Sequence, residues 1–466
     1  MSAPATVAEL CQWTGGQLIR GREDQTFTGT VIDSRAVGDG DLFVAIVGPN
    51  HDAHRFVGDV LMNGAAGALV QSDRLEETLP RSDGFLIHVE DTTEALAQLA
   101  HGHRQAFDGP LIGITGSNGK TTTKELCAGI LEGCGETLAT RGNLNNNYGV
   151  PLTLLRRSES ERYAVVEMGM NHRGEIAGLA AIADPTIGIL TNVGTAHIEF
   201  LGSREEIALE KGDLLAALPA TGVAIVGRDD ELAFAQAKRT EAKVLSFGFH
   251  AEADLRASEV RFLEEGAYAF QLDSPFGQGE IRVSGLAETI VENALCAAGG
   301  AFAAGATFDQ VRDGLAGHAG VSGRMQPRLL PKDLLVIDDT YNANPQSMRN
   351  ALETLARLPA VGARYAALGP MGELGDASDE AHLNVGQLAA ELSLDGLFVL
   401  GEADNLVAEG ARRAGLADDR VVSHSNHEAL TQALLASLTK GDRVLVKGSR
   451  AARMERVVTM LEEAGH

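Results

Sequence analysis

The feature that most constrains this chain is the stretch of residues 111–125, Leu-Ile-Gly-Ile-Thr-Gly-Ser-Asn-Gly-Lys-Thr-Thr-Thr-Lys-Glu. It predicts a buried strand, a glycine-rich turn and the start of a helix, the order typical of a phosphate-binding P-loop. Gly116 and Gly119 would let the backbone approach phosphate oxygens, whose charge the helix N-terminus favours. We therefore expect a nucleoside triphosphate site, with Lys120 on the β- and γ-phosphates and Thr121 on Mg²⁺.

The motif departs by one residue from the common spacing, which has a glycine five positions before Gly119, where this chain has Ile114. The alternative is an ordinary glycine-rich turn before a helix. Gly-Lys-Thr at a strand-to-helix junction favours the phosphate site over that alternative.

Length and composition are those of a soluble α/β protein with large cores. The chain has 466 residues, of which 44% are hydrophobic; this suits about three α/β domains. The N-terminus lacks the charged and apolar regions of a signal peptide, and no apolar run is long enough to span a membrane. The four cysteines lack metal-ligand spacing, which favours reduced thiols and a cytoplasmic location.

The chain carries a net charge of −25. Nucleic-acid binders need a basic face for phosphates, so the charge argues against that class of partner. An acidic surplus with few lysines also suggests the hypothesis of a salt-rich cytoplasm.

The pattern of strands and helices divides the chain into three predicted domains. Residues 1–88 form an N-terminal unit without a P-loop, which contains Asp33-Ser34-Arg35 before a turn and a strand. Residues 89–324 alternate apolar strands with helical patterns, which predicts a largely parallel sheet covered on both faces. Residues 325–466 repeat that alternation as a second parallel α/β unit.

Two polar residues follow strands of the predicted central sheet. Glu167 ends the apolar run 163–168, and His197 follows the run 187–191. In open α/β sheets ligands bind beyond the carboxyl ends of strands, which is also where the P-loop lies. Glu167 offers an oxygen ligand for Mg²⁺, and His197 offers an imidazole for a second cation or a phosphate. The alternative for each is a helix cap or another satisfied polar residue.

Six motifs together resemble the Mur ligases, the ATP-dependent amide ligases of peptidoglycan precursor synthesis. They are Gly-Ile-Thr-Gly-Ser-Asn-Gly-Lys-Thr at 113–121, Gly-Asn-Leu-Asn-Asn-Asn-Tyr-Gly-Val-Pro at 142–151, Glu-Met-Gly-Met-Asn at 167–171, Thr-Asn-Val-Gly-Thr-Ala-His at 191–197, Gly-Arg at 323–324 and Asp-Asp-Thr-Tyr-Asn-Ala-Asn-Pro at 338–345. The last has the form of the members that add D-alanyl-D-alanine. The resemblance covers nearly the whole chain.

The resemblance implies three domains: a small N-terminal α/β domain for a UDP-sugar, a central P-loop ATPase with a parallel sheet, and a C-terminal Rossmann-like domain. It implies an ATP-dependent, ADP-forming ligase that joins D-alanyl-D-alanine to UDP-N-acetylmuramoyl-tripeptide through an acyl phosphate. We expect a monomer that uses ATP and one or two Mg²⁺ ions.

The same resemblance assigns residues to each role. It assigns catalysis to Lys120, Lys211, His197 and Arg324, and metal binding to Thr121, Glu167, His197 and Lys211, with Lys211 carbamylated. It assigns nucleotide contacts to Gly116, Ser117, Asn118, Gly119, Lys120, Thr121, Thr122, Asn293, Arg324 and Asp338. It assigns substrate contacts to Asp33, Ser34 and Arg35 for the uridine nucleotide, Thr140, Asn143 and Asn146 along the muramoyl-peptide, and Tyr341, Asn342 and Asn344 in the cleft.

The chain departs from the family pattern near the expected adenine. The helix signature His-Asn-Val-x-Asn-Ala appears as Thr289-Ile290-Val291-Glu292-Asn293-Ala294, so Asn293 is kept and the His-Asn pair is replaced. A second departure is Pro370, where an acidic residue is usual.

Two other functions stay open. One is a related amide ligase with a different amine acceptor, such as a folylpolyglutamate synthetase; the Asp33-Ser34-Arg35 domain argues against this one. The other is a non-catalytic nucleotide-binding regulator, which the set Thr121, Glu167, His197 and Lys211 argues against.

Overall fold

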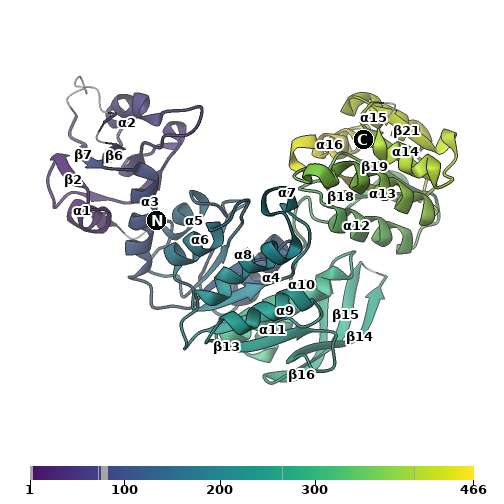
Figure 1. The fold of residues 1–466 in the computed structure, drawn as a ribbon, viewed down its shortest axis with the longest axis horizontal. Coiled ribbons are helices and arrows are strands. Elements are labelled where there is room, and N and C mark those ends of the chain that lie inside the picture. Colours follow the sequence, from purple (N-terminus) through teal and green to yellow (C-terminus); the bar gives the residue numbers. More distant parts are fainter. Residues whose placement is uncertain (1–3, 72, 75–81, 265, 403–404, 466) are drawn as a thin grey trace.

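A computed structural model describes residues 4–71, 73–74, 82–264, 266–402 and 405–465. Three large sheets follow one another along the chain. Figure 1 shows the N-terminal and C-terminal segments at opposite ends of the molecule, with the nine-stranded sheet between them. The α/β architecture expected from the sequence is confirmed, while the residue boundaries 88/89 and 324/325 stay predictions.

The N-terminal segment holds a five-stranded sheet and a two-stranded pair. In spatial order the sheet contains β2 (Gln17–Arg20), β7 (Phe85–Val89), β6 (Gly67–Gln71), β5 (Asp41–Val44) and β4 (Gly29–Val31). The pair is β1 (Ala5–Thr6) with β3 (Thr26–Phe27), and the helices are α1 (Val7–Thr14) and α2 (Val57–Met62). β2 is antiparallel to β7, and the other neighbours in the sheet are parallel.

The central segment is built on the nine-stranded sheet. Its spatial order is β16 (Gly277–Ser284), β15 (Ala267–Ser274), β14 (Leu255–Leu263), β13 (Lys243–Gly248), β12 (Val223–Gly227), β11 (Ile187–Leu190), β8 (Leu111–Thr115), β10 (Tyr163–Glu167) and β9 (Thr137–Ala139). From β9 across the sheet to β14, every strand is parallel to its neighbours. The pairs β14–β15 and β15–β16 are antiparallel. The turn residues and alternation of residues 260–284 predict an antiparallel addition to the sheet. It begins earlier than that pattern, at Leu255, because a bulge between Ser258 and Arg261 breaks the alternation.

Helices cover both faces of this sheet because side chains alternate along each strand. Val165 and Ile189 pack toward α4 (Lys120–Glu132) and α10 (Thr289–Ala303). Val166 and Leu190 face the opposite core. The remaining helices are α3 (Thr92–Arg104), α5 (Gly149–Leu154), α6 (Glu175–Ala183), α7 (Ile198–Leu201), α8 (Arg204–Ala216), α9 (Glu231–Ala235) and α11 (Phe308–Ala316).

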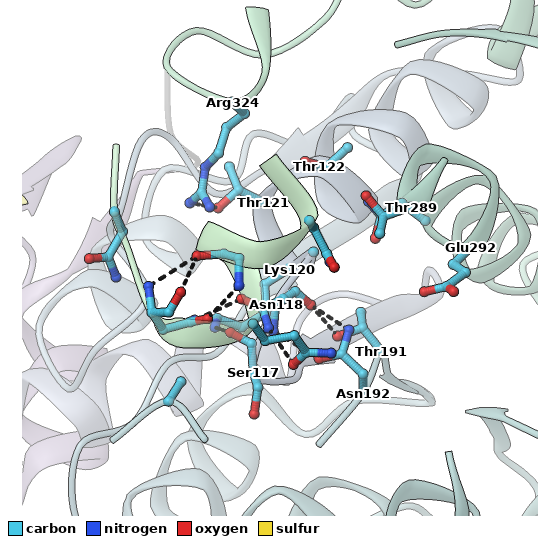
Figure 2. Close-up of a pocket in the computed structure, with 18 of the residues that line it drawn as sticks. Ser117, Asn118, Lys120, Thr121, Thr122, Thr191, Asn192, Thr289, Glu292 and Arg324 are labelled. Atoms are coloured by element: carbon cyan, nitrogen blue, oxygen red, sulfur yellow. Dashed lines mark hydrogen bonds between the residues drawn. The ribbon is translucent and has the colours of Figure 1, made fainter. Parts of the chain in front are cut away.

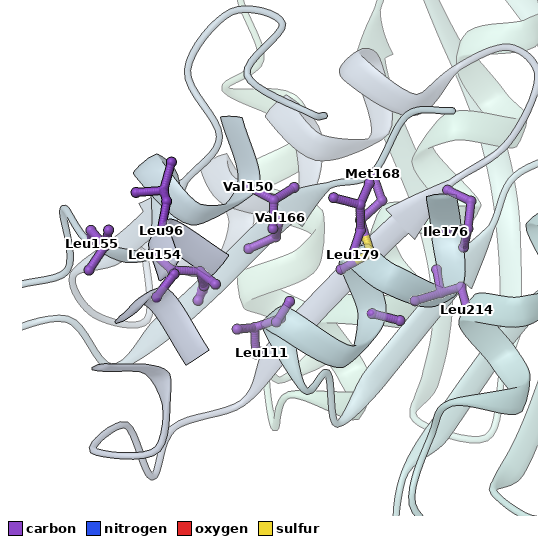
Figure 3. Close-up of a cluster of buried hydrophobic side chains, with 14 of the residues drawn as sticks. Leu96, Leu111, Val150, Leu154, Leu155, Val166, Met168, Ile176, Leu179 and Leu214 are labelled. Atoms are coloured by element: carbon purple, nitrogen blue, oxygen red, sulfur yellow. The ribbon is translucent and has the colours of Figure 1, made fainter. Parts of the chain in front are cut away.

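The second core joins the N-terminal and central segments. Figure 3 shows Leu96 of α3 beside Leu154 of α5, with Leu111, Val166 and Leu179 farther along the same cluster. The cluster continues into the N-terminal sheet. Helix α3 therefore anchors that sheet to the P-loop domain through buried apolar surface.

The C-terminal segment holds a six-stranded sheet. Its order is β17 (Gln326–Leu330), β18 (Leu334–Asp339), β22 (Arg443–Lys447), β19 (Arg364–Leu368), β20 (Gly396–Leu400) and β21 (Val421–His424). All neighbours are parallel except β17 with β18. The helices are α12 (Pro345–Arg357), α13 (Ser378–Glu391), α14 (Leu406–Arg413), α15 (His427–Ser437) and α16 (Glu455–Ala464).

Candidate active site at the P-loop

The P-loop has the backbone that its glycines predict. Gly116 and Gly119 have φ of 151° and 82°, and Gly119 caps α4. A Cβ at Gly116 would lie 1.8 Å from Thr191 Oγ1, and one at Gly119 would lie 2.2 Å from Asn293 Oδ1. Both positions therefore combine a positive φ with close packing that favours glycine.

The loop is held from the neighbouring strand by the segment that follows β11. Thr191 Oγ1 and Asn192 Nδ2 donate to the Asn118 carbonyl at 2.6 and 3.1 Å, and Asn192 Oδ1 accepts from the Asn118 N–H. Ser117 Oγ accepts from the Gly194 N–H. Figure 2 shows this network beside Lys120.

Lys120 folds back onto the loop. Its Nζ donates to the Gly116 carbonyl at 2.7 Å, and burial together with Arg324 lowers its pKa. A loop carbonyl is a replaceable partner, so a phosphate oxygen can take its place.

Glu167 is a buried carboxylate with one oxygen left over. It is 2% exposed; Oε1 accepts from Asn145 Nδ2 at 2.8 Å, whereas the buried Oε2 has no hydrogen-bond partner. Thr140 Oγ1 accepts from the Glu167 N–H, so Thr140 positions this residue from outside the cavity. An unpaired buried carboxylate oxygen in the cavity that Thr121 also lines has the chemistry of an Mg²⁺ ligand.

No group of three His, Cys, Asp or Glu side chains with metal-site geometry occurs among the described residues. A magnesium site here would thus depend on Thr121, Glu167, phosphate oxygens and water. His197, the expected ligand of a second metal, instead faces the C-terminal segment. Its Nδ1 lies 2.6 Å from Glu373 Oε2, an ion-pair distance, although the approach lacks hydrogen-bond geometry.

Lys211 is buried in α8 and does not line the cavity. It is 1% exposed and makes no hydrogen bond or ion pair within the described part of the chain. Burial, and then the charge of Lys120, hold its pKa well below the usual lysine range. Without the family resemblance, a lysine in a helical pattern is assigned to the surface by default, and for Lys211 that default is wrong. Ile207 and Leu214 lie four positions before and three after it, so helical periodicity could have identified the buried face.

Arg324, which directly precedes the C-terminal segment, and polar side chains of that segment contact the P-loop. Arg324 Nη2 donates to Thr121 Oγ1 at 3.0 Å, and its guanidinium lies 4.0 Å from the centre of the Tyr341 ring. Asn118 Nδ2 donates to Gln346 Oε1 at 3.0 Å, and Asn344 Nδ2 donates to Asn118 Oδ1 at 2.8 Å.

A cavity of about 1190 Å³ lies between these segments. The predicted site residues that line it are Ser117, Asn118, Gly119, Lys120, Thr121, Thr122, Asn143, Asn146, Glu167, His197, Asn293, Arg324, Tyr341, Asn342 and Asn344. Those outside its lining are Asp33, Ser34, Arg35, Gly116, Thr140, Lys211 and Asp338.

Asp338 and Asp339 show how strand alternation separates two adjacent carboxylates. Asp338 accepts from Thr340 Oγ1 at 2.6 Å, away from the cavity, whereas Asp339 lines it. Asp339 accepts from Lys447 Nζ at 2.6 Å and from the Met325 N–H. Successive side chains of a strand point to opposite faces, which explains the difference.

Asp33, Ser34 and Arg35 lie in the N-terminal segment. Arg35 pairs with Asp33 at 2.7 Å, and the Arg35 side chain is 88% exposed. This pair lowers the pKa of Asp33 to about 2. The group is exposed to solvent and open to a ligand.

The sequence analysis missed four polar residues in or beside the site. They are Asn145, Gln346, Glu292 and Glu373. Asn145 lies in the motif at 142–151, but that run contains four asparagines and nothing in it distinguishes the partner of Glu167. The positions of the other three at the site depend on the tertiary fold.

Further observations concern the cysteines, the helices and the family models. All four cysteines are free thiols. Among the described residues, no helix is both long and apolar enough to cross a membrane. Two family models match, the Mur ligase middle domain over residues 114–301 and the Mur ligase glutamate ligase domain over residues 323–450.

Relatives match over almost the entire length. The UDP-N-acetylmuramoyl-tripeptide–D-alanyl-D-alanine ligase of Escherichia coli K12 is 36% identical, covering 99% of each chain. The crystal structure of MurF from Acinetobacter baumannii is 33% identical with a TM-score of 0.90, covering 99% of each chain. MurF ligase from Thermotoga maritima in complex with ADP is 32% identical with a TM-score of 0.82, covering 94% of this chain and 97% of that one. With this fold, this P-loop and full-length identity above 30%, the chain belongs to the Mur ligase family.

Proposed function

We propose that this protein is an ATP-dependent ligase that joins D-alanyl-D-alanine to UDP-N-acetylmuramoyl-tripeptide. The observation that carries the proposal is the contact of Arg324 with Thr121. Arg324 directly precedes the C-terminal segment, so this contact brings the start of that segment onto a P-loop whose cavity holds an unpaired buried carboxylate. Full-length similarity to ligases of that name supports the choice of substrates.

The reaction proceeds in two steps. A carboxylate oxygen of the tripeptide attacks the γ-phosphorus of ATP, and the bond to ADP breaks to leave an acyl phosphate. The amine of D-alanyl-D-alanine then attacks the acyl carbon. The bond to phosphate breaks, phosphate leaves, and the amine loses a proton. Activation is required because oxide is too poor a leaving group, whereas phosphate leaves readily.

Phosphoryl transfer needs positioning and charge neutralisation more than covalent help. Lys120 would exchange the Gly116 carbonyl for phosphate oxygens, and Arg324 would approach the same group from the C-terminal side. Thr121 and Glu167 would hold Mg²⁺, which when bound neutralises phosphate charge. The cavity between the segments would keep water from the acyl phosphate.

Lys211 has the chemistry for the expected carbamate. Burial holds the pKa of the Lys211 amine well below its usual range, which favours the uncharged form that can add CO₂ to give N–COO⁻ with release of one proton. The carbamate would replace an unpaired buried amine by an anion that supports a metal with Glu167. His197 would serve a second metal after leaving Glu373.

The remaining contacts follow the family assignment. Asp33, Ser34 and Arg35 would bind the uridine nucleotide. Thr140, Asn143 and Asn146 would serve the muramoyl-peptide, with Thr140 acting through Glu167. Tyr341, Asn342 and Asn344 would line the cleft, and Asn293 and Asp338 would lie on the nucleotide side. A monomeric state and a cytoplasmic location stay predictions.

The test measures phosphate release from Mg-ATP and the mass of the product. The full chain is incubated with UDP-N-acetylmuramoyl-tripeptide, with and without D-alanyl-D-alanine. Release only when both are present, with the ligated mass, supports the proposal. Phosphate release with a different amine would show a ligase with another acceptor. No phosphate release at any salt concentration would favour the non-catalytic regulator.

A further inference from the structure

Glu292 lines the cavity on the side of the P-loop away from Thr121, the expected Mg²⁺ ligand. It lies in the first turn of α10 with Thr289, and Figure 2 draws both beyond the loop from Arg324 and Thr121. The next residue, Asn293, accepts from Thr123 Oγ1 of the P-loop helix at 3.4 Å, which attaches this turn to the loop. Lys120 and Thr121 mark the γ-phosphate end, so the base of a bound nucleotide extends toward the other end.

The Glu292 carboxyl has no hydrogen bond or ion pair within the described residues. The neighbouring carboxylates are already used by backbone groups. Asp229 accepts from the N–H groups of residues 249 and 250, and Asp230 accepts from those of residues 193, 232 and 233. The Glu292 carboxyl is therefore left for a ligand, and it is less exposed than Glu231, which lines the same cavity.

The surroundings suit a flat ring with one polar edge. Phe247, Leu286 and Ile290 line the same cavity as apolar side chains. Burial, and then the charges of Asp229, Glu288 and Asp230, raise the pKa of Glu292 to about 7. Cys296, one turn farther along α10, is the other titratable group that interacts with it.

We propose that the Glu292 carboxyl hydrogen-bonds the Watson–Crick edge of the nucleotide base and sets the preference for adenine over guanine. A neutral carboxyl has one O–H donor and one carbonyl acceptor. These match adenine, whose N1 accepts and whose N6 amine donates. A carboxylate has two acceptors and instead matches the N1–H and N2 amine of guanine. This inference deepens the proposed function and rests on it for the use of ATP.

The complementarity predicts a dependence on pH. At a pH below the pKa of Glu292 the carboxyl is neutral and selects adenine. At a pH above this pKa the carboxylate has no O–H group to donate to adenine N1. A bidentate base contact is worth about 1–3 kcal/mol, and about 1.4 kcal/mol is tenfold. We therefore expect the ratio of GTP to ATP dissociation constants to fall about tenfold between pH 6 and pH 8.5.

The experiment measures ATP and GTP binding to the full chain by calorimetry across that range. ATP and GTP carry the same triphosphate, so its protonation affects both dissociation constants equally and does not change their ratio. In Glu292→Gln, the amide keeps one donor and one acceptor and cannot ionise, so the preference for ATP should persist at every pH. The matched control Glu288→Gln removes the same charge one turn earlier and should keep both the preference and its fall with pH.

A wild-type ratio that stays constant from pH 6 to pH 8.5, or a Glu292→Gln ratio that falls like the wild type, would overturn the proposal. If Glu292→Gln does not fold, the wild-type series alone decides. Binding that follows the prediction in a protein without ligase turnover would support the role of Glu292 and overturn only the proposed function.

Discussion

Replacing Lys211 by methionine removes a buried amine and keeps a side chain of similar length. Lys211 has no partner in the described structure, and burial holds its pKa well below the usual range. In the unfolded chain the pKa returns to about 10.4. Between the two values the unfolded state binds one more proton than the folded state, so the stability of the wild type rises with pH.

The slope follows from that one proton. It amounts to about 1.4 kcal/mol per pH unit, and Lys211→Met should lack this contribution. For a unit of about 150–250 residues, 1 kcal/mol shifts Tm by about 2–4 °C. Over the part of the alkaline range that lies between the two pKa values, we therefore expect the Tm of the wild type to rise with pH relative to the variant, by up to about 3–5 °C per unit.

Scanning calorimetry in CO₂-free buffer checks the slope. The matched control is Lys243→Met, which removes an exposed lysine at the start of β13 in the same segment and should keep the wild-type slope. Added bicarbonate should raise the Tm of the wild type and leave Lys211→Met unchanged, since only the former can form the carbamate. Equal pH slopes in wild type and Lys211→Met would refute the reasoning.

Three further changes test the site. Lys120→Ala should lower ATP turnover by at least about a hundredfold, because it removes a preorganised cation from the transferred phosphate; near-normal phosphate release would contradict this. Gly119→Ala should weaken ATP binding and lower stability by about 1–2 kcal/mol, since the new methyl group meets Asn293 at 2.2 Å. Its control Gly129→Ala, in the same helix with no atom within 4 Å, should stabilise by about 0.5–1 kcal/mol, and an equal loss in both would show that packing at the loop is not the cause. Lys211→Ala should lose ligase activity and regain part of it with formate or acetate; full activity without them would exclude the carbamate.

Local signals explain what the sequence predicted well. Residues 111–125 contain a strand, two glycines and a helix start in one continuous stretch, so their conformation depends little on distant partners. The position of Glu167 and His197 at the P-loop cavity was predictable because strand ends in a parallel sheet share one edge, while their roles stay predictions. The wrong surface assignment of Lys211 came from its polar neighbours, which obscured the apolar periodicity on either side.

The remaining features depend on edges and on distant contacts. β17 and β21 escaped prediction because they are edge strands, and Pro327 in β17 is a residue that edges tolerate. The pairing of His197 with Glu373 joins two domains, and one sequence carries no signal for it. Predicting which of Asp338 and Asp339 lines the cavity required the exact register of the strand. A shift of one residue moves each side chain to the other face of the sheet.

The contact of Asn118 with Gln346 and Asn344 has a consequence for how the domains meet in different ionic strengths. All three side chains are uncharged amides. Dissolved ions screen the attraction between exposed charges and leave bonds between neutral amides nearly untouched. An acidic chain that held its domains together by ion pairs alone would loosen as electrolyte accumulates. This junction should instead keep the C-terminal domain seated on the P-loop from dilute buffer to concentrated KCl.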